Sequence, residues 1–188
     1  MSIEPECRAR WITRDLPGLT FQREVMPAPC LRREFDCPAV FRKALVRIAA
    51  PGYCDLRLDG GRIDRSELAP TVSVFDRRVR FLEIDVTGRL VPGKRSTWSA
   101  VLGNGWYNCH THEVWHFDKA PWRDYPKFRF ELEIDGELFL ASDRSWRVAT
   151  GGLLFDGLRN GETYDARLEP SGWRLPGFDD SGWERAVI

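Results

Sequence analysis

The sequence predicts an all-β protein built as an antiparallel β-sandwich or jelly roll. Short segments in which apolar and polar residues alternate recur at intervals of about ten residues. Turns rich in Gly, Pro, Asn and Asp separate these segments, and no stretch has the pattern of an amphipathic helix. With 188 residues, of which 43% are hydrophobic, the chain is long enough to bury one sizeable core. One domain is therefore the simplest expectation.

The N-terminal part is predicted to differ from the rest. Residues 1–30 contain Pro17, Gly18, Pro27 and Pro29, a spacing that interrupts any helix, and we expect them to form an arm that wraps the sandwich. The β-sandwich domain itself is expected to span residues 31–188. Its first strands are predicted at 31–36 and 40–49.

Two hairpins stand out in the region that follows. Residues 53–58 alternate cleanly and run into Asp59-Gly60-Gly61-Arg62, and residues 128–134 alternate up to Asp135-Gly136 before alternation resumes at 137–140. An Asp-Gly pair between alternating segments is a strong hairpin signal. A further strand is expected around 79–86. In all of these strands one face belongs to the core and the other faces water.

Charge and cysteine content exclude several classes of partner. Lys and Arg number 28, and so do Asp and Glu, which leaves no basic surface for nucleic acid or an anionic membrane. No run approaches the ~18 apolar residues of a membrane span. The five cysteines include no Cys-x-x-Cys pair, and the N-terminus lacks the pattern of a signal peptide. We therefore expect a reducing, cytoplasmic setting, with no nucleic acid and no membrane as partner.

The apolar run 98–102 ends in Gly103-Asn104-Gly105-Trp106-Tyr107, the most distinctive stretch of the chain. Two glycines around an asparagine permit a tight loop, and two aromatic rings follow at once. A sugar ring has an apolar face and a rim of hydroxyls, so an aromatic side chain next to an amide suits it. The alternative is a tight turn in which Trp106 fills the core.

A second candidate site lies a few residues further on. All three histidines, His110, His112 and His116, fall within seven positions and follow Cys109. His-x-His on an extended strand places both imidazoles on one face, as a transition metal requires. No acid or second cysteine completes a recognisable set of ligands. A polar loop whose histidines bond to the backbone is therefore the favoured interpretation.

Taken together, nine motifs resemble the N-terminal domain of bacterial α-L-rhamnosidases, and they keep the order and approximate spacing of that family over nearly the whole chain. They are Leu31-Arg32-Arg33-Glu34-Phe35, Gly52-Tyr53, Asp59-Gly60, Leu68-Ala69-Pro70, Asp85-Val86-Thr87, Gly103-Asn104-Gly105-Trp106-Tyr107, Asp143-Arg144-Ser145-Trp146, Gly161-Glu162-Thr163-Tyr164-Asp165-Ala166-Arg167 and Phe178-Asp179-Asp180-Ser181-Gly182-Trp183.

The resemblance implies a jelly-roll sandwich of the galactose-binding-domain-like kind. It also implies a place in a larger enzyme that removes terminal α-L-rhamnose from glycosides or polysaccharides by inversion. The carboxylates of that enzyme lie on a separate (α/α) barrel, which this chain is too short to contain. We therefore expect no catalytic residues and no hydrolysis by this chain alone. The acids Asp179-Asp180 and Glu162/Asp165 lie in turn-rich sequence and are expected to cap turns.

Some domains of this family bind rhamnose through a calcium ion held by Asp and Asn oxygens. By that resemblance Asp59 and Asn104 are the candidate calcium ligands, and Asn104, Trp106, Tyr107 and Asp59 the candidate sugar-binding residues. Leu58 departs from the pattern, because the binding members have a second oxygen-bearing residue before the turn. The sequence thus identifies a possible cofactor but also a missing ligand.

Three functions remain open. In the first function, the domain is an accessory carbohydrate-binding or substrate-recognition module, whose partners are a rhamnose-containing glycoside or polysaccharide and a catalytic barrel. In the second function, it is a purely structural domain whose exposed aromatic side chains pack on that barrel. In the third function, it is a stand-alone metal or sugar binder unrelated to hydrolysis. A sugar titration separates the first function from the second.

Overall fold

The computed structural model describes residues 9–16, 26–110 and 115–188, and all its long elements are strands. The strands are β1 (Pro29–Asp36), β2 (Ala44–Ala49), β3 (Tyr53–Leu58), β4 (Gly61–Arg62), β5 (Phe81–Asp85), β6 (Arg95–Gly103), β7 (Arg129–Ile134), β8 (Glu137–Ala141), β9 (Arg147–Thr150), β10 (Leu153–Gly157), β11 (Gly161–Tyr164) and β12 (Glu184–Arg185). Two short 3-10 turns, η1 (Phe117–Lys119) and η2 (Ala166–Leu168), lie in the connections.

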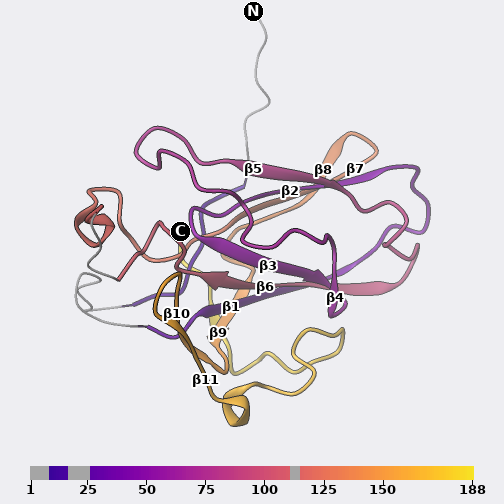
Figure 1. Ribbon diagram of the computed structural model, residues 1–188. Helices are drawn as coiled ribbons and strands as arrows, with labels where there is room; N and C mark the ends of the chain where they lie inside the picture. The colour runs from indigo at the N-terminus through magenta and orange to yellow at the C-terminus, as the bar shows by residue number, and fades with distance from the viewer. Residues whose placement is uncertain (1–8, 17–25, 111–114) are drawn as a thin grey trace, which may run out of the picture.

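The strands form two sheets that pack face to face (Figure 1). One sheet has six strands in the order β12-β9-β1-β6-β3-β4, and the other has four in the order β5-β2-β7-β8. Strands β10 and β11 form a separate hairpin on the side of the six-stranded sheet. All pairings are antiparallel. The predicted antiparallel β-sandwich is confirmed.

Both predicted hairpins are present. Asp59 and Gly60 connect β3 to β4 with φ values of 49° and 78°, and Asp135 and Gly136 connect β7 to β8 with φ values of 50° and 89°. Two consecutive positive φ values give the turn a twist that matches the flanking strands. The strand predicted at 40–49 begins only at Ala44, and Val40 is 85% exposed. The apolar side chain of Val40 therefore does not mark the start of the strand.

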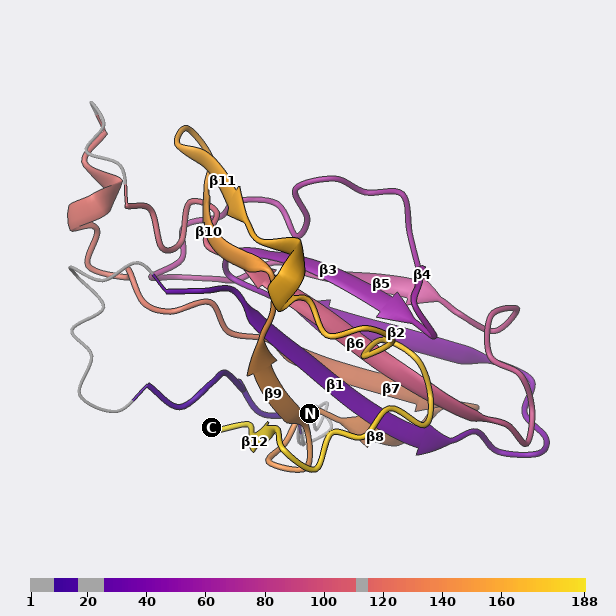
Figure 2. The ribbon, with the colours of Figure 1, turned by 90° about the horizontal axis from the view of Figure 1, so that it is seen from below.

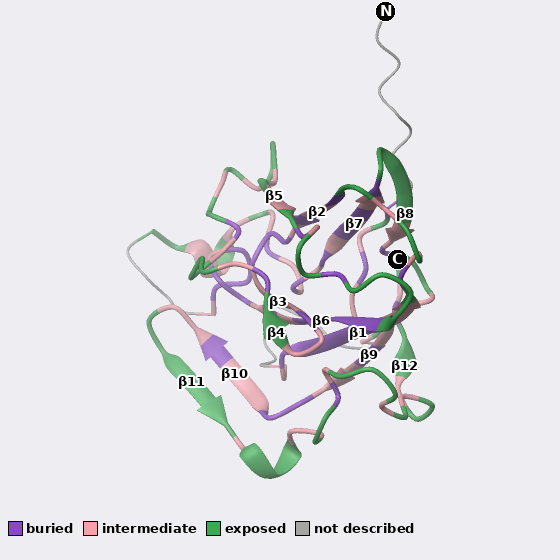
Figure 3. Cartoon of the chain, turned by 90° about the vertical axis from the view of Figure 1, so that its right-hand side faces the viewer, coloured by how far each residue is buried: buried purple, intermediate pink, exposed green. Residues whose placement is uncertain are grey.

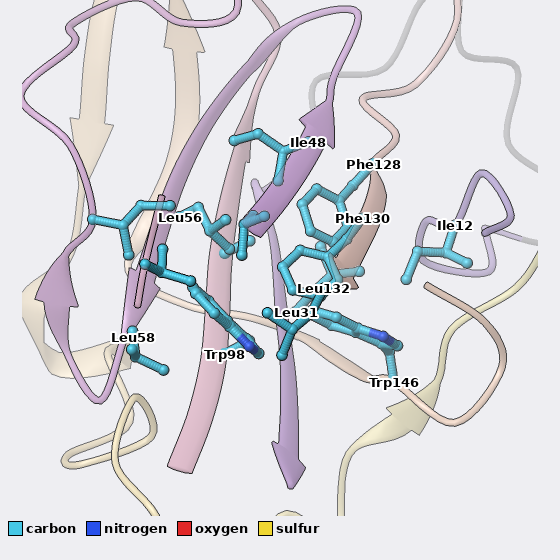
Figure 4. Packing of buried hydrophobic residues seen from close by; sticks show 14 of the residues in the cluster. Ile12, Leu31, Ile48, Leu56, Leu58, Trp98, Phe128, Phe130, Leu132 and Trp146 are labelled. Atoms are coloured by element: carbon cyan, nitrogen blue, oxygen red, sulfur yellow. The ribbon is translucent and has the colours of Figure 1, made fainter. Parts of the chain in front are cut away.

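The core lies between the two sheets, where inward-facing residues from both meet (Figure 4). Strand β6 contributes Trp98, which is fully buried, and β7 contributes Phe130 at a ring-centroid distance of 5.2 Å from it. Trp146, just before β9, packs edge-on against Phe130, also at 5.2 Å. Strands β1 and β6 are mostly buried, while the short edge strands β4, β11 and β12 are exposed (Figure 3). Burial of these rings stabilises the packing of the two sheets against each other.

The outer face of the six-stranded sheet is covered by the C-terminal segment, which runs across it between β11 and β12 (Figure 2). Arg32, on β1, points outward into this segment and is only 1% exposed. Its guanidinium donates to the carbonyl oxygens of Trp173 at 3.0 Å and Leu175 at 3.2 Å, and it also pairs with Asp180. One arginine thus fastens three points of the covering segment.

The outer face of the four-stranded sheet carries a row of alternating charges. Arg47 on β2 donates to Glu83 on β5 at 2.7 Å and to Glu133 on β7 at 2.8 Å.

Within the predicted arm, Ile12 is fully buried and pairs with Phe128, just before β7. The rest of the predicted arm, at 1–8 and 17–25, lies outside the described residues. None of the described helical segments is long and apolar enough to cross a membrane.

Candidate functional site

Asn104, the central residue of the predicted sugar motif, is held inside the protein. It is 6% exposed, its backbone N–H donates to Asp156 Oδ1 at 2.7 Å, and its Nδ2 donates to Asp156 Oδ2 at 2.9 Å. Its Oδ1 accepts from Nδ2 of Asn108 at 2.7 Å. Both polar atoms of the amide therefore have partners within the chain. Asn104 therefore orients the Asp156 carboxylate.

The turn that carries Asn104 depends on close backbone contact. Gly105 has a φ of 53°, and a Cβ at Gly52 would lie 2.0 Å from the carbonyl oxygen of Gly103. A side chain at Gly52 would therefore push the start of β3 away from the end of β6. The close contact explains the glycine at position 52, and the positive φ explains the glycine at position 105.

The two aromatic rings of the motif pack within an aromatic cluster. Tyr107 is 7% exposed and meets the edge of Phe75 at a centroid distance of 5.3 Å. Trp106 is half-buried and packs against Trp115 at 5.9 Å and Phe117 at 5.3 Å. Tyr107 therefore offers no open face for stacking. The exposed ring of the cluster is that of Trp115, which is 56% exposed.

Asp59 and Asn104 are not brought together. In the pairing of β3 with β6, Leu58 lies opposite Trp98 and Tyr53 lies opposite Gly103, so the two residues follow opposite ends of β3. A six-residue strand separates them by roughly 17–20 Å. Asp59 Oδ1 instead accepts from the backbone N–H of Thr97 at 2.7 Å, which ties the β3–β4 turn to β6. The expectation of one calcium site shared by these residues is therefore wrong.

The histidine cluster does not form a metal site among the described residues. Arg123 Nη2 lies 3.0 Å from His110 Nδ1, and a guanidinium that donates to this nitrogen occupies it. Burial and the Arg123 charge lower the pKa of His110. His112 lies outside the described residues, and His116 precedes η1 in a left-handed conformation. Within the described part of the chain no three His, Cys, Asp or Glu side chains come together as metal ligands.

A groove of about 230 Å³ opens beside the predicted motif, and we call it the Asp156 groove. Gly103 lies between two of its walls, because a Cβ there would be 3.3 Å from Asp156 Oδ1 and 3.4 Å from Tyr53 Cβ. Strands β3 and β6, the β10–β11 hairpin and the connection after β4 form the groove. Its lining includes Tyr53, Asp55, Arg62, Glu67, Leu68, Val101, Leu153, Asp156 and Glu162.

The electrostatics of the groove centre on Asp156. The pKa of this carboxyl is raised from 3.8 to about 6, mostly by burial and also by the charge of Glu162, its cross-strand partner. Hydrogen bonds from Asn104 and Gly105 act in the opposite direction. Asn108, bonded to Asn104, also accepts from Nε of the buried Arg123 at 3.0 Å. A chain of buried polar groups thus links the groove to the loop around Arg123.

Sequence reasoning missed Tyr53 and Asp156 as site residues. The available signal was an acid inside the apolar run Leu153-Leu154-Phe155-Asp156, where a charge needs a partner. Of the four acids predicted to cap turns, Asp179 and Asp165 do so, whereas Asp180 pairs with Arg32 and Glu162 lines the groove. Asp179 accepts from the N–H of Ser181 at 3.0 Å, and Asp165 caps η2 by accepting from the N–H of Arg167.

Comparison with known proteins agrees with this architecture. The family described as the α-L-rhamnosidase N-terminal domain matches residues 39–188. The chain belongs to this family. An α-L-rhamnosidase from Streptomyces avermitilis is 35% identical over 158 residues, which are 81% of this chain and 15% of that protein. A crystal structure of a Streptomyces avermitilis α-L-rhamnosidase complexed with L-rhamnose superposes with a TM-score of 0.74 at 31% identity, covering 87% of this chain and 16% of that one.

Two further rhamnosidase structures resemble this domain of the family. The α-L-rhamnosidase from Dictyoglumus thermophilum has a TM-score of 0.81 at 30% identity, covering 97% of this chain and 21% of that one. The native enzyme from Aspergillus terreus has a TM-score of 0.84 at 27% identity, covering 95% of this chain and 21% of that one. The chain therefore spans about a fifth or less of the length of these relatives.

Proposed function

We propose that this chain is a sugar-recognition accessory domain of an α-L-rhamnosidase-type glycoside hydrolase, and that the Asp156 groove is its binding surface. The observation that carries the proposal is a buried carboxylate, Asp156, that lines a groove next to the ring of Tyr53. Carboxylate oxygens accept hydrogen bonds from sugar hydroxyls, and an aromatic wall suits the apolar face of the ring. Asn104 holds this carboxylate in place.

The size of the groove favours a single sugar residue. At about 230 Å³ it is smaller than the ~300–1,000 Å³ of pockets that take drug-sized molecules. The relatives are named α-L-rhamnosidases, and the Streptomyces avermitilis structure is complexed with L-rhamnose. We therefore infer a rhamnose-containing glycoside or polysaccharide as the ligand. Hydrolysis is assigned to an (α/α) barrel elsewhere in the parent enzyme.

Calorimetric titration of the purified chain with L-rhamnose tests the proposal. Glu162→Gln removes a charged acceptor from the groove and is expected to weaken binding about tenfold. Glu137→Gln, an exposed glutamate on β8, is the matched control and should leave the affinity unchanged. Absence of binding, or equal affinity in both variants, would contradict the assignment. Chelation of calcium should leave the affinity for L-rhamnose unchanged. Binding that depends on calcium would instead indicate a site at the turn that carries Asp59.

Docking on the catalytic barrel is a second candidate function. The aromatic cluster favours it, because Trp115 is 56% exposed and the guanidinium of Arg159 lies 5.2 Å from its ring centroid. Exposed aromatic and arginine side chains are enriched in protein interfaces. Association of this chain with a separately produced barrel should weaken in Trp115→Ala. Unchanged association in that variant would remove the support for docking through this cluster.

A further inference from the structure

A second groove, of about 260 Å³, lies on the outer face of the four-stranded sheet, across the sandwich from the Asp156 groove. We call it the Trp11–Phe81 groove. Its lining includes Trp11, Arg47, Ala49, Val79, Phe81, Arg129 and Glu131. None of these residues belongs to the predicted motifs for sugar or metal.

Strand register explains why the sheet is hollow at this point. Ala49 on β2 lies directly opposite Phe81 on β5 and Arg129 on β7. Directly opposed residues point to the same face, so the methyl group of Ala49 forms a low floor between two large side chains. Phe81 is 61% exposed, although a phenylalanine in a strand is usually buried. Its ring is thus available to a ligand.

The arm supplies the second aromatic residue. Ile12 N donates to the carbonyl of Phe128 at 2.9 Å, and Phe128 N donates back at 3.0 Å. This bridge continues the pairing of β7 and places Trp11 beside Arg129 at the rim of the groove. Because its neighbour Ile12 is buried, the half-buried Trp11 is held in place before a ligand binds. Binding to it therefore loses little conformational entropy.

Two residues before Ala49 on β2, and on the same face, Arg47 provides a fixed polar group. Its Nε and Nη1 atoms donate to Glu83 and Glu133, and Nη2 has no hydrogen-bond partner among the described residues. The guanidinium is therefore held in one orientation with donors to spare. The adjacent Glu131 lies opposite Arg47 and offers acceptor oxygens.

We propose that the Trp11–Phe81 groove is a second sugar-binding site, which takes a neutral pyranose ring of a glycan. The two aromatic side chains suit the apolar face of such a ring, while Arg47 and Glu131 suit its hydroxyls. Arg47 and Arg129 are balanced by Glu83, Glu131 and Glu133, so the site does not favour an anion. The small hollow, bounded by fixed charges, also differs from the broad apolar patch of a protein interface.

The inference is independent of the Asp156 groove, because the two sites lie on the outer faces of different sheets. A domain with both sites can hold two sugar residues of one branched polysaccharide at once. Such bivalent attachment strengthens binding to a polymer without new contacts.

The test uses the ¹⁵N-labelled full chain and methyl α-L-rhamnopyranoside as the probe. Of the eight tryptophan indole N–H signals, that of Trp11 is identified by its loss in Trp11→Phe. We expect this signal to shift and saturate during the titration. In Phe81→Ala the midpoint should rise about tenfold. Tyr164→Ala removes an aromatic side chain of similar exposure, 56%, outside both grooves and should leave the midpoint unchanged.

A Trp11 signal that stays in place up to the solubility limit of the sugar would overturn the proposal, as would equal midpoints in wild type and Phe81→Ala. The remaining amide signals report whether each variant is folded. Failure of the Asp156 groove is seen separately, as an absence of shifts at the backbone amides of Tyr53 and Asp156. Glu162→Gln should leave the Trp11 titration unchanged.

Discussion

The outer faces of the two sheets use the same residue type in opposite ways. On the six-stranded sheet, Arg32 points outward from β1 and is buried beneath the C-terminal segment, with 1% of its side chain exposed. On the four-stranded sheet, Arg47 points outward from β2 and remains 34% exposed between two glutamates. The difference is what covers each face. An outward-facing arginine in a strand therefore does not reveal whether its face meets water.

Burial changes what each arginine contributes. Removal of one partner from a buried ionic cluster leaves the other groups without compensation, whereas an exposed pair is screened by water. Arg32 also donates to backbone carbonyls that have no strand partner, so it substitutes for a missing sheet neighbour. Arg47 only links side chains that are already placed by their strands.

The largest expected effect is that of Arg32→Met. The substitution keeps most of the volume but removes the donor of the carbonyls of Trp173 and Leu175, and it leaves Asp180 with its longer contact to Arg147 at 3.6 Å. We expect the free energy of unfolding to fall by about 3 kcal/mol, measured by urea denaturation. A loss within the error of the measurement would mean that the covering segment is held by apolar packing alone.

The Asp156 carboxyl should make the free energy of unfolding depend on pH. Its pKa is about 6 in the folded protein, and it ionises near 3.8 when the chain unfolds. Between these values the folded state binds the extra proton, so its contribution to stability is full below pH 3.8 and is lost as the pH rises through about 6. The loss is on the order of 2 kcal/mol.

Asp156→Asn removes this titration and isolates it from all other groups. The difference in unfolding free energy between wild type and variant, measured from about pH 4 to about pH 7, should shift in favour of the variant as the pH rises. A difference that stays constant over this range would show that Asp156 ionises normally in the folded state.

Arg47→Met should have the smallest effect on stability and completes the comparison. Its two ion pairs are exposed, so the free energy of unfolding should fall by less than about 1 kcal/mol in the same urea experiment. The same variant should nevertheless weaken the Trp11 titration described above. A loss equal to that of Arg32→Met would show that coverage of the face does not set the contribution of the arginine.

Local patterns in the sequence determined the strands and turns well. Alternation at 128–134 and the Asp135-Gly136 pair predicted β7, β8 and their turn, because side-chain period and turn geometry depend on neighbours in the chain. The strand predicted at 40–49 was too long at its start. Val40 carries strand propensity but lies outside the sheet, where no partner strand reaches it.

The candidate site was predicted less well. Asn104, Trp106 and Tyr107 do lie in one loop, but their partners come from Asp156, Trp115 and Phe75, which are distant in the sequence. The proximity of Asp59 to Asn104 depended on which end of β3 each one follows. That information resides in the register of β3 with β6, and no local pattern contains it.

The sequence by itself determined the β-sandwich class, the two hairpins and the family, because these depend on local periodicity, on turn residues and on motifs in order along the chain. Only the tertiary structure decided that Asn104 supports Asp156, that Asp59 lies at the other end of the strand, and that Arg32 is buried while Arg47 is open. Those outcomes depend on contacts between residues far apart in the sequence. Strand order and register create such contacts, and a linear pattern does not specify them.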